Sequence, residues 1–155
     1  MNYWLIKSEA ECYSIDDLKT AKKTPWTGVR NYQARNFMRN EMKIGDLCLF
    51  YHSSSEPTGV AGIAKVISVP HADLSALDKK DEHFDTKATK DNPIWFCVDI
   101  GFVEKFKNFV TLQRIKIDPK LSGIVVAQRG SRLSIQPVSE KHFKYIAELG
   151  KKIGA

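Results

Sequence analysis

The sequence has few cysteines and no long apolar run. Its three cysteines, Cys12, Cys48 and Cys97, are odd in number and form no CxxC pair. This argues against a disulfide framework and a cysteine zinc site, and it favours a reducing compartment. No apolar run approaches the ~18 residues that a membrane-spanning helix needs, and the start of the chain lacks the pattern of a secretory signal. We therefore expect a cytoplasmic protein with no membrane partner.

The sequence also lacks the common enzyme motifs. It contains no GxxxxGK[ST] phosphate loop, no GxGxxG after a strand, no GxSxG elbow and no HxE…PCxxC pattern of zinc deaminases. Its histidines show no metal-like spacing. His52 and Ser53 are adjacent, and adjacent side chains of a strand point to opposite faces, so they make a poor nucleophile–base pair. The sequence predicts a protein that is not an enzyme and needs no metal or cofactor.

Positive charge is abundant and unevenly placed. The 155 residues carry a net charge of +6. Residues 19–43 hold seven basic side chains against one acid, and residues 101–135 hold seven against two. Residues 73–91, in contrast, are acid-rich. Two basic clusters on a chain of about one domain's length suggest a polyanionic partner, the alternative being a solvated basic surface.

Hydrophobic patterning predicts one α+β domain spanning residues 1–155. Residues 2–6 have the pattern of a strand buried on both faces. Further strands are expected at 47–52, 59–69, 95–106 and 111–117, and helices from Ser14, from Asn31 and from about Ser139. Most connections are short, except a polar stretch at 71–93, and loops of that length are often functional. We expect a curled mixed or antiparallel sheet, or a small barrel, with helices packed outside it.

A tryptophan in a loop is the first candidate for a binding site. Trp26 precedes Thr27 and is followed closely by Arg30 and Asn31. One interpretation is a loop aromatic that plugs the sheet, which is the commoner role of a single tryptophan. The other is a stacking platform for a nucleobase, with nearby basic groups on the phosphates.

Several longer motifs identify a family resemblance. The segments are YWLIKSE at 3–9, WTGVRNYQARNFMR at 26–39, GDLCLFYHSS at 45–54, GVAGIAKV at 59–66, WFCVDI at 95–100 and QRGSRLSIQPVS at 128–139. In this order, and over nearly the whole chain, the sequence resembles the EVE domain family. It departs from the family pattern at Ala10, where the family usually has proline after Lys-Ser-Glu.

The resemblance implies a PUA-like fold, a curled sheet or pseudo-barrel with flanking helices. EVE domains are similar to YTH domains, which bind methylated adenine in an aromatic cage, and they are regarded as readers of modified bases, notably modified cytosines in DNA. In bacteria they occur alone or fused to restriction-type nucleases, so such a nuclease is a candidate partner. By position, Lys7 and Ser8 match the shared Lys-Ser, and Trp26 and Thr27 match the first cage tryptophan and the residue after it. The second cage tryptophan has no counterpart, which argues against methyladenine.

The sequence therefore predicts a non-catalytic reader of a modified base, such as 5-methylcytosine or 5-hydroxymethylcytosine, flipped out of DNA or RNA. The expected base pocket is Ser8, Glu9, Trp26, Thr27, Asn31, Tyr51 and His52, and the expected phosphate contacts are Lys7, Arg30, Arg129 and Arg132. Glu9 suits cytosine because a carboxylate accepts from the exocyclic N4 amine. Asn31 has an alternative role as a helix N-cap. The rival functions are a hydrolase or nuclease-associated protein, with His52 or Glu9 as general base, and a sensor of small nucleotide metabolites.

Overall fold

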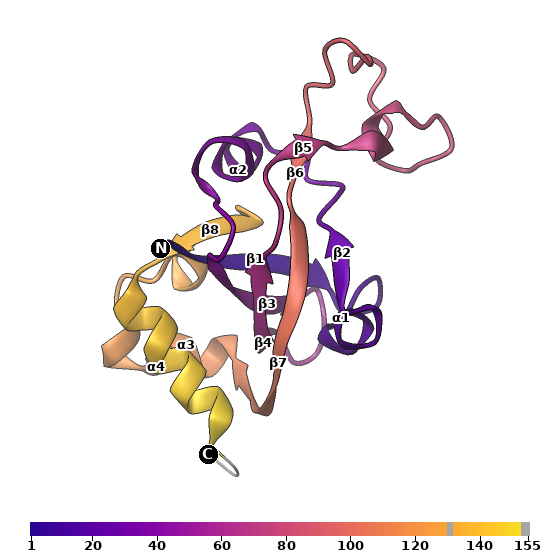
Figure 1. Ribbon diagram of the computed structural model, residues 1–155. Helices are drawn as coiled ribbons and strands as arrows, with labels where there is room; N and C mark the ends of the chain where they lie inside the picture. Colours follow the sequence, from indigo (N-terminus) through magenta and orange to yellow (C-terminus); the bar gives the residue numbers. More distant parts are fainter. Residues whose placement is uncertain (130–131, 153–155) are drawn as a thin grey trace.

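A mixed six-stranded sheet forms the centre of the molecule (Figure 1). The computed structural model describes residues 1–129 and 132–152. The strands are β1 (Tyr3–Glu9), β2 (Lys23–Pro25), β3 (Leu47–Ser53), β4 (Gly59–Val66), β7 (Asp99–Thr111) and β8 (Ile135–Val138). Their order across the sheet is β2-β7-β4-β3-β1-β8. β1 and β3 run parallel, whereas the other neighbours are antiparallel. The parallel pair ends at one edge of the sheet, with Glu9 beside Ser53.

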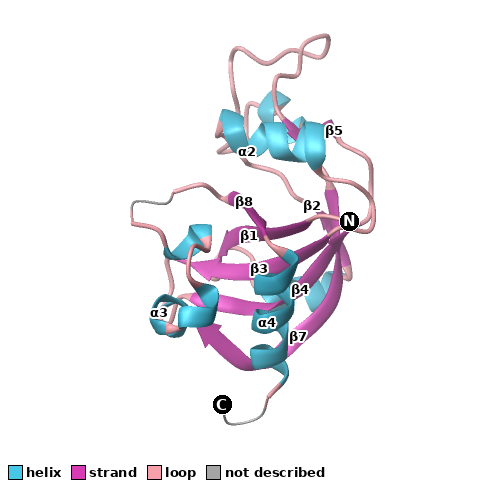
Figure 2. Ribbon diagram, turned by 90° about the vertical axis from the view of Figure 1, so that its left-hand side faces the viewer, coloured by secondary structure: helices cyan, strands magenta, loops and turns pink. Residues whose placement is uncertain are grey.

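The central strands are buried on both faces, as the apolar run at 2–6 predicts. Trp4 and Ile6 of β1 pack into one core, and Leu5 between them packs into the other. This alternation follows from the two-residue period of a strand. α4 (Glu140–Lys151) covers the second face, where Phe143 and Ile146 contribute to the same core as Leu5 (Figure 2).

The helices begin at the capping residues that the sequence indicates. Ser14 forms a capping box with Asp17 before α1 (Ile15–Ala21), and Ser139 caps α4. Asn31 caps α2 (Tyr32–Asn36), which continues as the π-helix η1 (Phe37–Glu41). Short 3₁₀ turns follow at η3 (Pro119–Leu121) and η4 (Val125–Ala127).

One predicted strand is a helix. Residues 111–117 were expected to extend as a strand, but only Thr111 belongs to β7, and α3 (Leu112–Ile117) follows. The Thr111 hydroxyl accepts a hydrogen bond from the Arg114 amide and caps the new helix, so the strand expectation is wrong. Ile115 is buried on one side of this helix while Ile117 is 73% exposed. The short strand β2 was expected to be part of a loop.

A long loop, residues 73–95, projects beyond the end of the sheet in both views (Figures 1 and 2). Its base is a two-stranded ribbon of β5 (His71–Ala72) and β6 (Phe96–Cys97). It contains the 3₁₀ turn η2 (Leu74–Leu77) and packs on a small core of its own. The polar connection expected at 71–93 is thus a folded part of the molecule.

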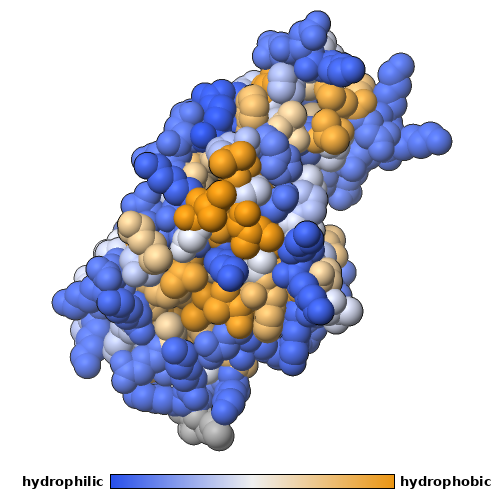
Figure 3. Space-filling model, in the orientation of Figure 1, coloured by the Kyte–Doolittle hydropathy of each residue, from blue (hydrophilic) through white to orange (hydrophobic). Residues whose placement is uncertain are grey.

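Apolar side chains gather in the middle of one face, between α4 and the long loop, and polar side chains surround them (Figure 3). No helix within the described residues is long and apolar enough to cross a membrane.

Candidate nucleic-acid interface

A cavity of about 700 Å³ lies where β1 ends and the long loop begins to overhang the sheet. We call it the Trp26 cavity. Its walls come from the end of β1 and the turn after it, from β2 and the segment that follows, from the end of β3, from the long loop, and from the segment just before β8. The lining residues are Lys7, Ser8, Glu9, Cys12, Tyr13, Thr24, Pro25, Trp26, Thr27, Gly28, Val29, Arg30, Ser53, Glu82, His83, Arg132 and Ser134.

Trp26 is both a core residue and a wall of this cavity. Its side chain is 8% exposed and belongs to the core that also holds Trp4. The indole meets the Phe50 ring edge-on with centroids 5.5 Å apart, and the Tyr13 ring at 6.4 Å. The ring therefore plugs the sheet, as the first interpretation has it, and its remaining surface lines the cavity, where stacking of a base stays a prediction.

Three further residues of the expected base pocket, Ser8, Glu9 and Thr27, also line the Trp26 cavity. The Ser8 hydroxyl donates to the Tyr13 carbonyl at 2.6 Å, which fixes the turn after β1. The thiol of Cys12 donates to Glu9 Oε2 at 3.5 Å, and this bond raises the pKa of the thiol. Glu9 itself is exposed, so its carboxylate is open to a ligand.

Across the cavity, the long loop is anchored on a buried carboxylate. Asp73 accepts from the Gly28 amide at 2.8 Å and from Arg30 Nη1 at 3.0 Å. Burial alone would raise the pKa of Asp73, but the hydrogen bonds from Ser75, Gly28 and Arg30 hold it below its ordinary value. Arg30 also donates to the His83 carbonyl at 2.7 Å. The guanidinium expected to bind phosphate is thus engaged in holding the loop, although it borders the cavity.

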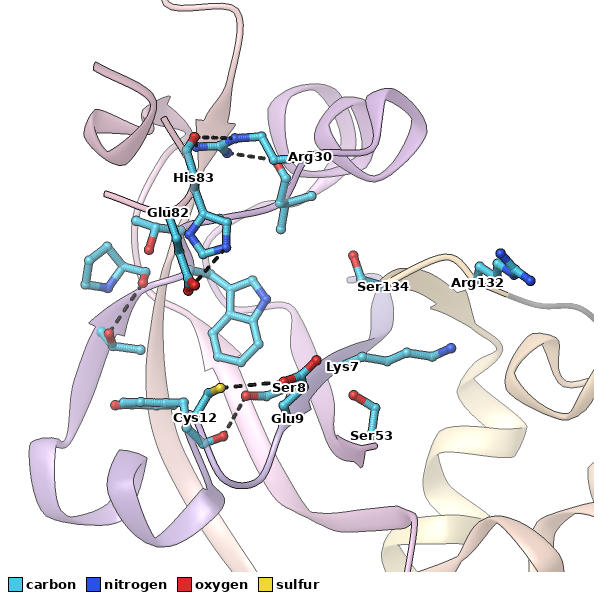
Figure 4. A pocket seen from close by; sticks show the side chains of 17 residues that line it. Lys7, Ser8, Glu9, Cys12, Arg30, Ser53, Glu82, His83, Arg132 and Ser134 are labelled. Atoms are coloured by element: carbon cyan, nitrogen blue, oxygen red, sulfur yellow. Dashed lines mark hydrogen bonds and ion pairs between the residues drawn. The ribbon is translucent and has the colours of Figure 1, made fainter. Parts of the chain in front are cut away.

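Glu82 and His83 are cavity residues that the sequence did not indicate. They face Glu9 and Cys12 across the opening (Figure 4). The His83 ring lies so close to Gly28 that a Cβ there would fall 2.8 Å from its Cε1 atom, and Gly28 has φ +85°. A glycine is therefore required at this point of closest approach. In the sequence, the feature that pointed to a role for this segment was its length, because long loops are often functional.

Lys7 and Arg132 lie on the side of the cavity away from Glu82 (Figure 4). No ion pair between described residues involves either side chain. Partial burial lowers the pKa of the Lys7 ammonium, whose nitrogen lies 5.8 Å from the centre of the Tyr51 ring. Both cations are available to an anionic ligand.

Four of the expected site residues lie outside this cavity. Asn31 accepts from the Ala34 amide and caps α2, which is its alternative role. His52 accepts from the Ile15 amide at 3.1 Å and packs between Phe50 and Phe109, and burial lowers its pKa.

The other two, Tyr51 and Arg129, line a second cavity of about 590 Å³, the Tyr51 cavity. Tyr51 and His52 diverge because successive residues of β3 face opposite sides of the sheet.

The comparisons with known proteins agree with one another. The family model of the EVE domain matches residues 2–149. Human thymocyte nuclear protein 1 is 38% identical over 97% of this chain and 75% of its own length. A structure of a Leishmania major protein is 46% identical, with a TM-score of 0.92 over 97% of this chain and 95% of that one.

A crystal structure of human THYN1 in complex with DNA containing 5-methylcytosine has a TM-score of 0.90 and 37% identity. It covers 98% of this chain and 99% of that one. The YTH domain of Zygosaccharomyces rouxii MRB1, solved with N6-methyladenosine RNA, shares the fold at a TM-score of 0.55 and 15% identity, with 99% of this chain and 89% of that one covered. The fold is thus the curled mixed sheet with flanking helices that the resemblance implies.

The relatives also correct one expectation. Several vertebrate relatives carry the name thymocyte nuclear protein 1, which points to the nucleus and contradicts the expected cytoplasmic location. The match of the family model to nearly the whole chain, and identities above 30% to proteins that the chain covers by two thirds or more, lead to one assignment. This chain belongs to the EVE domain family.

Proposed function

We propose that this protein is a non-catalytic reader of modified cytosine, and that the base leaves its stack and enters the Trp26 cavity. The carrying observation is the composition of that cavity, which combines an aromatic wall, an open carboxylate and two cations that form no ion pair with another described residue. The structure of human THYN1 with DNA containing 5-methylcytosine supports the same class of ligand.

The cavity suits a single base in size and in polarity. Its volume of about 700 Å³ lies inside the ~300–1,000 Å³ range of small-molecule sites. The Cys12 thiol donates to Oε2 of Glu9, so Oε1 is left for the N4 amine of cytosine. The exposed part of Trp26 offers a stacking surface. Glu9 would therefore distinguish cytosine from thymine, which carries a carbonyl at the equivalent position.

The energetics require contacts outside the base. Unstacking and unpairing a base costs a few kcal/mol, and stacking on one aromatic residue returns roughly 1–3 kcal/mol. Because only part of the Trp26 ring is exposed, we expect its stacking free energy to fall at the lower end of that range. Phosphate contacts must supply the remainder, and Lys7 and Arg132 are placed for them. Binding should consequently weaken as salt rises.

The geometry favours a reader over a hydrolase that uses His52. His52 Nε2 already accepts the Ile15 amide, and the ring lies between two phenylalanines outside the Trp26 cavity. A general base must reach the proton that it removes. We therefore expect modified oligonucleotides to be recovered intact after incubation, with or without divalent metal.

A binding screen tests the proposal. Short DNA and RNA strands would carry cytosine, 5-methylcytosine, 5-hydroxymethylcytosine or N6-methyladenine at one central position. We expect the modified cytosines in DNA to bind most tightly, and Glu9→Gln to reduce their affinity about tenfold, within the ~1–3 kcal/mol of a specific base contact. Glu11→Gln, which removes an exposed carboxylate outside the cavity, is the matched control.

Two results would contradict the proposal. The first is equal affinity for all four bases at the central position. The second is an affinity for modified cytosine that Glu9→Gln and Glu11→Gln reduce equally. A third comparison separates the metabolite sensor, because a sensor would bind the free mononucleotide as tightly as the strand and would show little dependence on salt.

A further inference from the structure

The Tyr51 cavity is the second hollow of the molecule, and it differs chemically from the first. Its lining residues are Lys7, Tyr51, Leu112, Lys116, Val126, Ala127, Gln128 and Arg129. Three of these are cations and none is an acid. The Trp26 cavity, in contrast, includes Glu9 and Glu82. An all-cationic rim attracts a phosphate and does not select a base by its amine.

The described part of the chain supplies no acidic partner for the cations of the Tyr51 cavity. No ion pair within residues 1–129 and 132–152 involves Lys7, Lys116 or Arg129. Lys7 Nζ lies 5.8 Å from the centre of the Tyr51 ring. The ammonium is thus held above an aromatic face, where it can contact an anion without losing that attraction.

One wall of the cavity is apolar and is formed by Leu112, Val126 and Ala127. Leu112 begins α3, and Val126 and Ala127 belong to η4, so two different elements supply the wall opposite β3. Gln128 is fixed by a hydrogen bond from its Nε2 to the Ile124 carbonyl at 3.3 Å. A nucleotide matches this combination, because the flat face of its base can pack on the apolar wall while its phosphate meets the cationic rim.

Lys7 connects the two cavities, because it lines both. On β1 its neighbour Ser8 faces the core that contains Trp26, and Tyr51 on β3 belongs to the opposite core. The cavities therefore lie on the two sides of the same sheet edge. A strand whose modified base occupies the Trp26 cavity would pass Lys7 and reach the Tyr51 cavity next.

We propose that the Tyr51 cavity binds the nucleotide adjacent to the modified base in the same strand, with Lys116 and Arg129 on its phosphate and the apolar wall against its base. The inference rests on the proposed function of the Trp26 cavity. It makes the protein a reader of a dinucleotide step, in which one cavity selects the modification and the other selects an unstacked neighbour. Lys7 would bind the phosphate between the two nucleotides.

The first test compares charge variants on two ligands. Lys116→Ala/Arg129→Ala should weaken binding to a five-nucleotide strand with central 5-methylcytosine by about ten- to a hundredfold. It should also reduce the salt slope by about 0.7 for each lost phosphate contact. Binding to free 5-methyldeoxycytidine, which has no neighbour, should be unchanged. Lys141→Ala/Lys151→Ala on α4 removes the same charge outside both cavities and is the control.

The second test addresses the neighbouring base. An abasic residue placed on one side of 5-methylcytosine should lower affinity for the unaltered protein several-fold. The same change on the other side should have little effect, because the Tyr51 cavity lies on one side of Lys7 and can receive only one of the two neighbouring bases. Equal effects from both sides, or none from either, would overturn the inference.

The experiments distinguish failure of the proposed function from failure of the proposed role of the Tyr51 cavity. If the unaltered protein does not distinguish 5-methylcytosine from cytosine, the proposed function is wrong. If it does, but Lys116→Ala/Arg129→Ala behaves like the α4 control on the five-nucleotide strand, only the role of the Tyr51 cavity is wrong.

Discussion

Replacing Trp26 should cost both stability and affinity, because its ring serves the core and the cavity together. The side chain is 8% exposed and meets Phe50 and Tyr13 edge-on. Deleting a core aromatic costs ~3–5 kcal/mol, and two edge-on ring contacts place Trp26→Ala inside that range. A loop tryptophan acting only as a stacking platform would cost less. Trp26→Phe keeps an aromatic ring in the core and is the variant for binding measurements, with an expected loss of affinity of up to tenfold.

Urea unfolding and oligonucleotide titration of the same samples separate the two roles. Trp4→Phe is the matched control, since Trp4 is 2% exposed, donates to Asp46 at 3.0 Å and lies outside both cavities. We expect both variants to lose stability and only Trp26→Phe to lose preference for modified cytosine. If Trp26→Phe and Trp26→Ala bind modified strands like the unaltered protein under conditions where they remain folded, Trp26 is a core residue alone and the base does not stack on it.

Three further changes test the walls of the cavity and the core beside it. Asp73→Ala removes the buried carboxylate that anchors the long loop. We expect the free energy of unfolding in urea to fall by about 3 kcal/mol and the amides of the loop to exchange faster. A fall below about 1 kcal/mol would show that the loop stays in place without this carboxylate. Burial lowers the pKa of His52 from its ordinary 6.5, so the unfolded chain binds the proton more tightly than the folded chain. The free energy of unfolding should therefore fall as the pH drops from about 6.5 towards the folded-state pKa. His52→Gln should make the free energy of unfolding less dependent on pH in this range. Gly28→Ala places a methyl group against His83 at a φ of +85° and should cost about 1–3 kcal/mol, more than Gly45→Ala, where φ is +97° and nothing lies within 4 Å; equal losses would assign the whole cost to the backbone.

Much of the fold could be predicted from local sequence signals. Strands buried on both faces leave continuous apolar runs, and the residues at 2–6 show one. Helix starts need side chains that accept from free backbone amides, so Ser14, Asn31 and Ser139 marked three helices correctly. The segment after Thr111 was wrongly predicted to be a strand because Ile115 and Ile117 are spaced as in a strand. In the helix, Ile115 is buried and Ile117 is exposed.

The candidate site was partly predictable for a similar reason. Ser8, Glu9, Trp26 and Thr27 lie in two short motifs that the family resemblance covers, and these residues line one cavity. Tyr51 and His52 were placed with them because they end a neighbouring strand. The alternation of side chains along β3 instead turns Tyr51 towards the Tyr51 cavity and His52 to the other face, where it packs between Phe50 and Phe109.

The wall formed by the long loop could not be inferred from the sequence. More than fifty residues of chain separate Gly28 from His83, whose ring lies against it, and from Glu82, which lines the same cavity. No periodicity encodes that approach. It depends on the buried bond between Asp73 and the Gly28 amide, and a single aspartate in an acid-rich segment carries no signal of burial.

The separate core of the long loop gives one wall of the binding site a stability of its own. Ala76, Ala88 and Trp95 are the buried residues of this small cluster, apart from the two cores of the sheet. Segments with few buried contacts open at a lower free energy than the domain as a whole. The apparent affinity then equals the intrinsic affinity multiplied by the fraction of molecules in which the loop is closed. Under the proposed function, substitutions in this cluster would change how tightly a strand is held and would leave the groups proposed to recognise the base unchanged.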